Sequence, residues 1–272
     1  MLKQRIITGV ILGSAFITAI LLLNTLWLAV VFALLIVLGA FEWCKLSELN
    51  MPLIRVLYSA LLLLLMYFGW MFLQSASSIV PVMATAAVWW LLALFWVMNY
   101  PMGNQKTRSN KLIKLFAGIL VLLPAWLGLV YLHQERSAHW VLYIMSIIWV
   151  ADSGAYTAGK KWGKRKLAPK VSPGKSWEGV FGAVVACSIY ALVGIYWLDI
   201  QTAYVLPFVL LSVLIVPVSV LGDLFESMVK RHSGHKDSGN ILPGHGGVMD
   251  RIDSLTAAVP VFVLGITILG IH

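Results

Sequence analysis

The segment from Gly222 to Ser254 holds more ionisable side chains than any other part of this chain. It reads GDLFESMVKRHSGHKDSGNILPGHGGVMDRIDS and lies between two long apolar runs. Because a charge beside hydrocarbon is costly to desolvate, such residues point to function. Carboxylates at both ends of a glycine-rich, basic loop indicate a divalent-metal site next to a phosphate-binding loop. The carboxylates are Asp223, Glu226, Asp237, Asp250 and Asp253.

Spacing predicts that two helix ends present these groups. The first set recurs every three or four positions, so it shares one face if the preceding apolar helix continues this far. The same spacing recurs at the start of the last apolar run. The first set is Asp223, Glu226, Ser227 and Lys230, and the second is Asp250, Asp253 and Ser254.

The carboxylates suit a hard cation that accompanies a nucleoside triphosphate. Mg²⁺ prefers carboxylate and water oxygens, and a triphosphate needs such a cation to offset its charge. We therefore predict Mg²⁺ as cofactor, with Asp223 and Asp250 as ligands. The alternative is that one of them is salt-bridged to Lys230 or Arg251. The carboxylates expected to complete or surround the ligand shell are Glu226, Asp237 and Asp253.

The bases of the same segment suit phosphate contacts. These bases are Lys230, Arg231 and Lys236. His245 stands between two Gly-containing pairs, Pro243-Gly244 and Gly246-Gly247, so it either hydrogen-bonds a phosphate or shapes the turn. No Cys or Glu spacing supports a zinc site.

A second polar segment, GKKWGKRKLAPKVSPGKS, follows the sixth apolar run. Lys175 and Ser176, just before a helix start, can offer an ammonium and backbone N–H groups to a phosphate. A Walker loop is excluded because Pro169 occupies the position of its first glycine and no strand precedes it. Glu178 is either a site residue or a favourable charge in the first helical turn. The bases from Lys160 to Lys166 serve equally well as a topology anchor.

Asp152 ends the sixth apolar run, where a carboxylate has little water to solvate it. It could cap a break in the helix or pair with a lysine. Its place inside an apolar run favours a role in substrate binding.

Two stretches carry a resemblance to a known family. SMVKR followed by KDSGNILPGHGGVMDRID, and ADSGAYTAGKKWGKRKLAPKVSPGKSWEG upstream, resemble the marked regions of the phosphatidate cytidylyltransferases. The resemblance implies conversion of CTP and phosphatidate to CDP-diacylglycerol and pyrophosphate with Mg²⁺, and it suggests K⁺ as a second ion. The first half of the chain matches in hydropathy only. The matching positions of the downstream stretch are Ser227, Lys230, Arg231, Lys236, Asp237, His245, Gly246, Gly247, Asp250, Arg251 and Asp253.

Composition specifies the elements that must position these groups. The chain has 272 residues, of which 60% are hydrophobic and 11% charged, with a mean hydropathy of +0.89. That is typical of an all-α, polytopic membrane protein and excludes a soluble core. A 19-residue window predicts about nine spans, at 6–23, 26–43, 56–73, 80–98, 115–132, 139–158, 177–197, 204–223 and 254–271.

The distribution of bases predicts the orientation in the membrane. With the amino terminus inside, Arg136 is the one outer base among the 20 Lys and Arg residues. The positive-inside rule then places the amino terminus and the candidate site in the cytoplasm and the carboxy terminus outside, in a bacterial-type inner membrane. No nucleic-acid partner is expected. Cys44 and Cys187 are too scattered for a disulfide framework and are expected to be unpaired.

We expect residues 1–138 to form a scaffold and residues 139–272 to form the catalytic region. Gly9 and Gly13 form a GxxxG pattern, which favours close packing within the chain and leaves open a homodimer. One alternative function is a CTP-dependent lipid or polyprenol kinase. Another is a transporter of an anionic solute, but transporter sites lie near the bilayer midplane, whereas these acids cluster at the cytoplasmic ends of spans.

Overall fold

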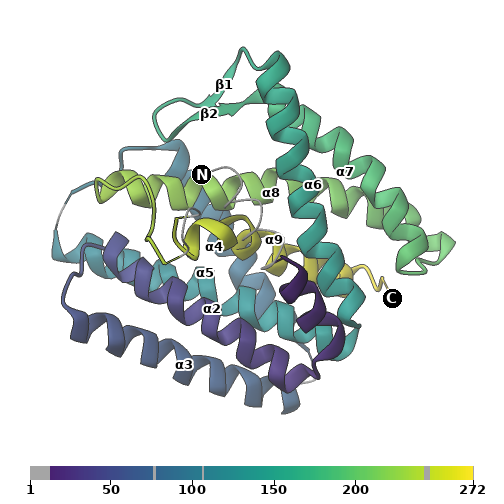
Figure 1. Ribbon diagram of the computed structural model, residues 1–272, viewed down its shortest axis with the longest axis horizontal. Helices are drawn as coiled ribbons and strands as arrows, with labels where there is room; N and C mark the ends of the chain where they lie inside the picture. Colours follow the sequence, from purple (N-terminus) through teal and green to yellow (C-terminus); the bar gives the residue numbers. More distant parts are fainter. Residues whose placement is uncertain (1–12, 76–77, 106, 242–245, 272) are drawn as a thin grey trace.

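The protein is a bundle of helices with one small hairpin (Figure 1). The computed structural model describes residues 13–75, 78–105, 107–241 and 246–271. The long helices are α2 (Thr25–Leu46), α3 (Pro52–Ser75), α4 (Val80–Met98), α5 (Arg108–Glu135), α6 (Ala138–Trp162), α7 (Trp177–Trp197), α8 (Val205–His232) and α9 (Met249–Ile268). The short elements are the apolar helix Gly13–Leu22, the strands β1 (Lys166–Ala168) and β2 (Ser172–Ser176), and the 3₁₀ turn η1 (Thr202–Tyr204).

The predicted polytopic all-α architecture is confirmed. Within the described residues, eight helices are long and apolar enough to cross a membrane. The first predicted span, 6–23, falls partly outside the described residues, and the short helix Gly13–Leu22 is its described part. Gly9 also lies outside them. Among the described residues, no atom lies within 4 Å of where a Cβ of Gly13 would be, so these residues do not show the predicted close packing.

Two helix boundaries differ from those predicted. The eighth span was expected to end at residue 223, but α8 continues to His232. The ninth was expected to begin at residue 254, but α9 begins at Met249. The mean hydropathy of a window falls where charged residues enter a helix, although the helical backbone continues. These extra turns carry Glu226, Ser227, Lys230 and Arg231 on α8 and Asp250, Arg251 and Asp253 on α9.

Strands β1 and β2 form an antiparallel hairpin between α6 and α7, with Lys166 paired to Ser176 and Ala168 to Ser172. The sequence analysis did not predict it. These strands are too short and too basic to show a strand pattern. The hairpin holds Lys175 beside the start of α7.

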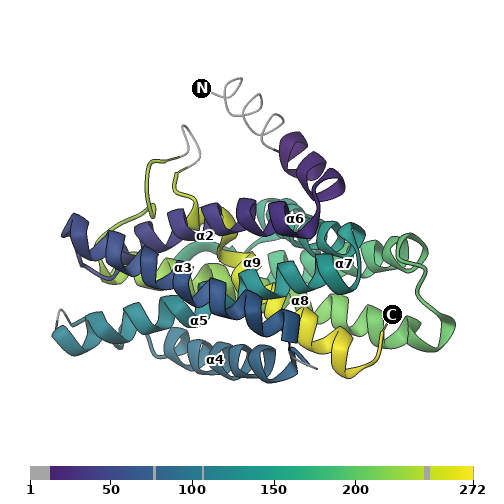
Figure 2. The same ribbon diagram turned by 90° about the horizontal axis from the view of Figure 1, so that it is seen from below.

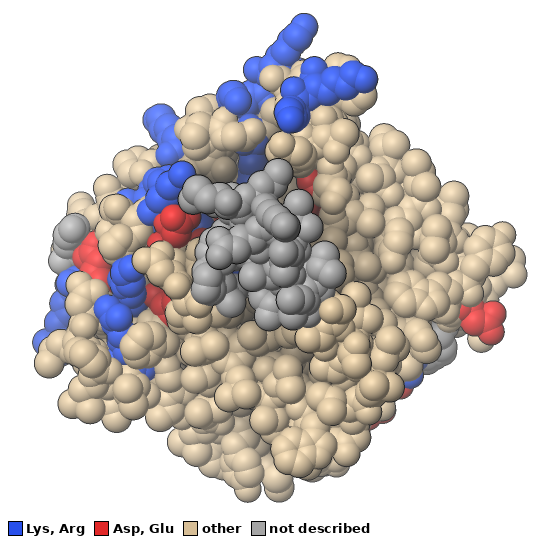
Figure 3. Space-filling model, in the orientation of Figure 1, with Lys and Arg blue, Asp and Glu red and all other residues tan. Residues whose placement is uncertain are grey.

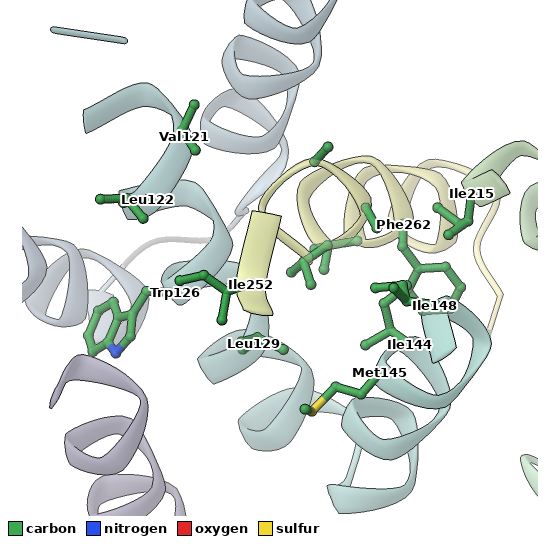
Figure 4. Packing of buried hydrophobic residues seen from close by; sticks show 14 of the residues in the cluster. Val121, Leu122, Trp126, Leu129, Ile144, Met145, Ile148, Ile215, Ile252 and Phe262 are labelled. Atoms are coloured by element: carbon green, nitrogen blue, oxygen red, sulfur yellow. The ribbon is translucent and has the colours of Figure 1, made fainter. Parts of the chain in front are cut away.

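Helix α9 lies in the middle of the bundle, with α2 on one side and α4 on the other (Figure 2). It contacts α5, α6 and α8 as well. Ile252 at one end of α9 lies towards Leu129 and Trp126 of α5, whereas Phe262 lies towards Ile148 of α6 (Figure 4). α9 thus touches helices on both sides of the proposed division at residue 138, and that division stays a prediction.

Lys and Arg side chains gather over the hairpin and over neighbouring helix ends, at the top and left of Figure 3. Most of the lower part of this face is free of charged side chains in the same view. This distribution motivates a test of the predicted orientation. Gln201, between α7 and α8, and Asn240, between α8 and α9, are exposed and should lie on opposite sides of the membrane.

We expect an impermeant thiol reagent to label Gln201→Cys in intact cells, and to label Asn240→Cys only after the membrane is opened. The native thiols, Cys44 and Cys187, are free and buried, as expected, so background labelling should be low. Labelling of both introduced cysteines in intact cells would contradict the predicted orientation.

Candidate active site

The last turns of α8 present four of the predicted site residues. Asp223, Glu226, Ser227 and Lys230 lie on this one helix, as their spacing predicted. The Ser227 hydroxyl donates to Asp223 Oδ1 at 3.1 Å. The Lys230 ammonium pairs with Glu226, whose side chain is only 1% exposed. Glu226, predicted as a metal ligand, is thus the buried counterion of Lys230.

Asp250, in the first turn of α9, uses both of its carboxylate oxygens. Oδ1 lies 2.7 Å from Lys230 Nζ. Oδ2 accepts the backbone N–H of Ser238 at 3.0 Å, the hydroxyl of Ser238 at 2.9 Å and the backbone N–H of Gly247 at 2.8 Å. Gly246 has a φ of 83°, which disfavours other residues, and allows the chain to turn back onto this carboxylate. Asp250 therefore links α8, α9 and the segment between them. Its salt bridge with Lys230 is the alternative to metal binding that the sequence analysis left open.

Asp223 faces a different neighbour, Lys175 of the hairpin, whose ammonium lies 2.6 Å from Asp223 Oδ2. Both side chains line a cavity of about 490 Å³ between α6, β2, α7 and α8. Asp152, Tyr156 and Lys160 of α6 line it as well. The predicted grouping of Asp152 with the site is consistent with this cavity, which combines two carboxylates with two ammonium groups.

Small residues allow α6 and α7 to approach closely beside the cavity. A Cβ on Gly154 would lie 2.9 Å from Ala186 Cβ and 3.0 Å from the Gly182 carbonyl oxygen. Glycine at such crossings lets helix backbones pack against each other in a membrane. The glycines thereby bring Asp152 of α6 and Lys175, just before α7, to the same cavity.

The hairpin is attached to the start of α7 by two side chains. Ser176 is the N-cap of α7, and its hydroxyl accepts the N–H of Gly179 at 3.2 Å. The Glu178 carboxylate accepts the backbone N–H groups of Lys164 and Arg165, each at 3.2 Å. Ser176 thus caps α7 and also lines the cavity beside Lys175, and its role in substrate binding stays a prediction. Glu178 attaches α7 to the segment that leads into the hairpin.

The other predicted site residues are more dispersed. Arg231 donates from Nε to the Val171 carbonyl oxygen at 3.4 Å, which links α8 to the hairpin turn. Lys236 and Asp237 are exposed between α8 and α9. His245 lies outside the described residues. The remaining two, both on α9, are the exposed Arg251 and the partly buried Asp253.

Sequence reasoning missed Glu42 of α2, which is 3% exposed. Its Oε2 accepts the Met249 N–H at 2.9 Å and lies 3.0 Å from the Ser238 hydroxyl, whose single proton it shares with Asp250 Oδ2. Because it ends an apolar run near Lys45, it looks like an ordinary span boundary. The signal that could have found it is an acid inside a predicted span, the feature that drew attention to Asp152.

The donor set is compatible with Mg²⁺. Within the described residues, no three His, Cys, Asp or Glu side chains form a ready ligand cluster. Mg²⁺ is usually held by one or two carboxylates together with substrate phosphates and water, so such a cluster is not required. Asp223 and Asp152 line one cavity and offer only hard oxygen donors there. These residues fit a hard cation that binds together with a phosphate.

Together, the helices and the cavity define a polytopic membrane protein with a cavity that is lined by acidic and basic side chains. The family model for the cytidylyltransferase family matches residues 3–269. The chain belongs to this family, and so to the nucleotidyltransferase enzymes.

Similar proteins cover nearly the whole chain. A phosphatidate cytidylyltransferase of Pseudomonas aeruginosa is 46% identical over 263 residues, which cover 96% of each chain. One of Haemophilus influenzae is 39% identical over 281 residues, covering 96% of this chain and 97% of the relative. One of Bacillus subtilis is 30% identical over 275 residues, with 95% of each chain covered. These matches extend through the amino-terminal spans, where sequence analysis found likeness in hydropathy only.

Proposed function

We propose that this enzyme transfers the cytidylyl group of CTP to phosphatidate, giving CDP-diacylglycerol and pyrophosphate at the cytoplasmic face of a bacterial inner membrane. The observation that carries the proposal is the cavity at the ends of α6 and α8, where Lys175 and Lys160 stand beside Asp223 and Asp152. It can receive phosphate groups at headgroup depth, where a soluble nucleotide and a lipid meet. The names of the full-length relatives support the same pair of substrates.

The chemistry needs two polyanions brought together more than it needs an activated nucleophile. A phosphate monoester oxygen of phosphatidate is already anionic at neutral pH. It attacks the α-phosphorus of CTP, a new P–O bond forms, and the bond to the β-phosphate oxygen breaks to release pyrophosphate. Lysine and arginine side chains lower the barrier by offsetting charge and aligning the groups. Those proposed to hold phosphates are Lys175, Lys230, Arg231 and Lys236.

Asp223 and Asp250 are the proposed Mg²⁺ ligands, and bound Mg²⁺ would offset the negative charge of the triphosphate. Each carboxylate now lies against an ammonium group, Asp223 against Lys175 and Asp250 against Lys230. Each of the two carboxylates thus already stabilises a positive charge. The same lysines, once separated from their carboxylates, can turn to phosphate oxygens.

The position of a radioactive label distinguishes nucleotidyl from phosphoryl transfer. Purified protein, phosphatidate, Mg²⁺ and CTP labelled at the α-phosphate should give labelled lipid. CTP labelled at the γ-phosphate should leave the lipid unlabelled and release labelled pyrophosphate. The opposite pattern would identify a lipid kinase and contradict the proposal.

Direct attack predicts that pyrophosphate exchange depends on lipid. Cys44 and Cys187 are buried, and the hydrogen-bond partner of the Ser227 hydroxyl among the described residues is Asp223, not a histidine, so the Ser–His–Asp arrangement of a covalent nucleophile is not seen there. Labelled pyrophosphate should therefore enter CTP only when lipid substrate or product is present. Exchange of similar rate in lipid-free enzyme would indicate a cytidylyl-enzyme intermediate instead.

A further inference from the structure

The Glu42 carboxylate of α2 contacts the segment between α8 and α9 and also the first residue of α9. Oε2 lies within hydrogen-bonding distance of the hydroxyl of Ser238, which follows α8, and accepts the N–H of Met249, the first residue of α9. Both donors are about two hundred residues away in sequence, so these contacts join the first part of the chain to the last. Burial of a carboxylate is costly unless it is well hydrogen-bonded. A position with this cost, in an otherwise apolar helix, calls for an explanation beyond packing.

Two glycines fit directly against the same carboxylate. A Cβ on Gly247 would lie 2.6 Å from Glu42 Oε1, and one on Gly239 would overlap that oxygen outright. Real Cβ atoms do not approach an oxygen so closely, so with any side chain here either the Glu42 carboxylate or the segment would have to move. Glycine at these two positions lets the backbone of the segment rest on Glu42.

Ser238 connects Glu42 to the candidate active site. Its hydroxyl oxygen lies within hydrogen-bonding distance of both Glu42 Oε2 and Asp250 Oδ2, and its backbone N–H donates to Asp250 Oδ2. Asp250 in turn pairs with Lys230. Glu42 also accepts the N–H of Met249, the residue just before Asp250, at the positive end of α9. Two routes therefore lead from Glu42 to the Asp250 carboxylate, one through a side chain and one through the backbone.

We infer that Glu42 is a positioning residue for the reaction, which holds Ser238 and the first turn of α9 so that Asp250 and Lys230 face the substrates. This role rests on the proposed function of Asp250 and Lys230. It also gives α2 a part in catalysis, although α2 provides no group that touches the substrates. A displacement of about 1 Å at reacting groups can cost about 100-fold in rate.

The test combines turnover with amide hydrogen exchange of the intact protein in lipid or detergent. Glu42→Ala removes both hydrogen bonds and should lower kcat about 100-fold, with less than about a threefold change in the KM for CTP. Amides in residues 233–241 and 246–252 should exchange faster, while those of α5 stay protected. Glu42→Gln keeps an acceptor oxygen at nearly the same place and should retain kcat within about threefold.

Glu48→Gln is the matched control. Glu48 follows α2, lies 3.8 Å from Lys111 and takes no part in the contacts with Ser238 and Met249. It should leave both kcat and exchange near wild type. If Glu42→Ala does not accumulate, Gly239→Ala tests the same contact from the other side, because its Cβ would meet only the Glu42 side chain, and it should lower kcat with α2 unchanged. Near-normal kcat in either variant, or lost activity without faster exchange in the two segments, would overturn the inference.

The exchange measurement uses no substrate, so it separates this inference from the proposed reaction. If wild-type enzyme failed to form CDP-diacylglycerol but Glu42→Ala still loosened the two segments, the proposed function would fail and the contact would stand. If wild-type enzyme formed the product and Glu42→Ala changed neither kcat nor exchange, only the positioning role would fail.

Discussion

Replacing Asp223 by Asn should lower kcat by about two to four orders of magnitude. The change preserves size and the contact with Ser227, but it removes the charge that lies 2.6 Å from Lys175 in the cavity. Because the two side chains are 31% and 23% exposed, the ion pair should contribute about 1 kcal/mol or less to stability. The loss should therefore appear in turnover, measured with labelled CTP, and not in the amount of folded protein.

Nucleotide binding gives this prediction a second readout. Without Asp223, the Lys175 ammonium loses its ion-pair partner, so CTP should still bind and more Mg²⁺ should be needed for residual turnover. Asp199→Asn is the control. Asp199 is exposed, with a φ of 53°, a conformation that Asn adopts readily, so the substitution removes a charge without strain. Near-normal turnover of Asp223→Asn at low Mg²⁺ would show that Asp223 is not a ligand.

Replacing Asp250 by Asn should lower both activity and stability. Asn has one acceptor oxygen, whereas Asp250 faces an ammonium on one side and three hydrogen-bond donors on the other. In one orientation the Asn amide hydrogens would face the Lys230 ammonium, and in the other they would face the donors of Ser238 and Gly247. Loss of the charge also leaves Lys230 with Glu226 as its counterion in a buried place. Breaking a buried ion pair costs about 3–5 kcal/mol.

We expect kcat of Asp250→Asn to fall at least about 100-fold and the thermal unfolding midpoint to drop clearly below that of wild type. Unfolding can be followed by circular dichroism in the detergent used for the assay, with Asp199→Asn alongside. An unchanged midpoint would mean that the contacts of Asp250 with Ser238 and Gly247 do not support the fold. Unchanged turnover would remove Asp250 from the reaction.

The sequence predicted the α8 part of the site well because helical spacing is a local property. Asp223 and Ser227 lie one turn apart and contact each other, as their separation requires. The end of α8 was placed too early because charged residues lower hydropathy without breaking a helix. Here Lys230 is paired with Glu226 and Asp250, so the last turns can stay buried.

Contacts between distant segments could not be predicted in this way. Nothing near Glu42 in the chain indicates that Ser238 and Met249 will lie against it. The pairing of Asp223 with Lys175 depends on a hairpin too short to show a pattern. Ser176 was expected at a phosphate and lines the cavity, but its cap of α7 was not predicted, because the residue types that bind phosphate also cap helices.

The central place of α9 has a consequence for biosynthesis. This helix follows all the others in the chain, so the ribosome delivers it after the helices that surround it. Until then Glu42 lacks its donors and Lys230 lacks Asp250. A nascent chain in the membrane therefore carries a solitary acid and an incompletely neutralised base, which attract the arriving segment. A chain that stops before α9 would therefore lack Asp250 and the Met249 N–H that Glu42 accepts.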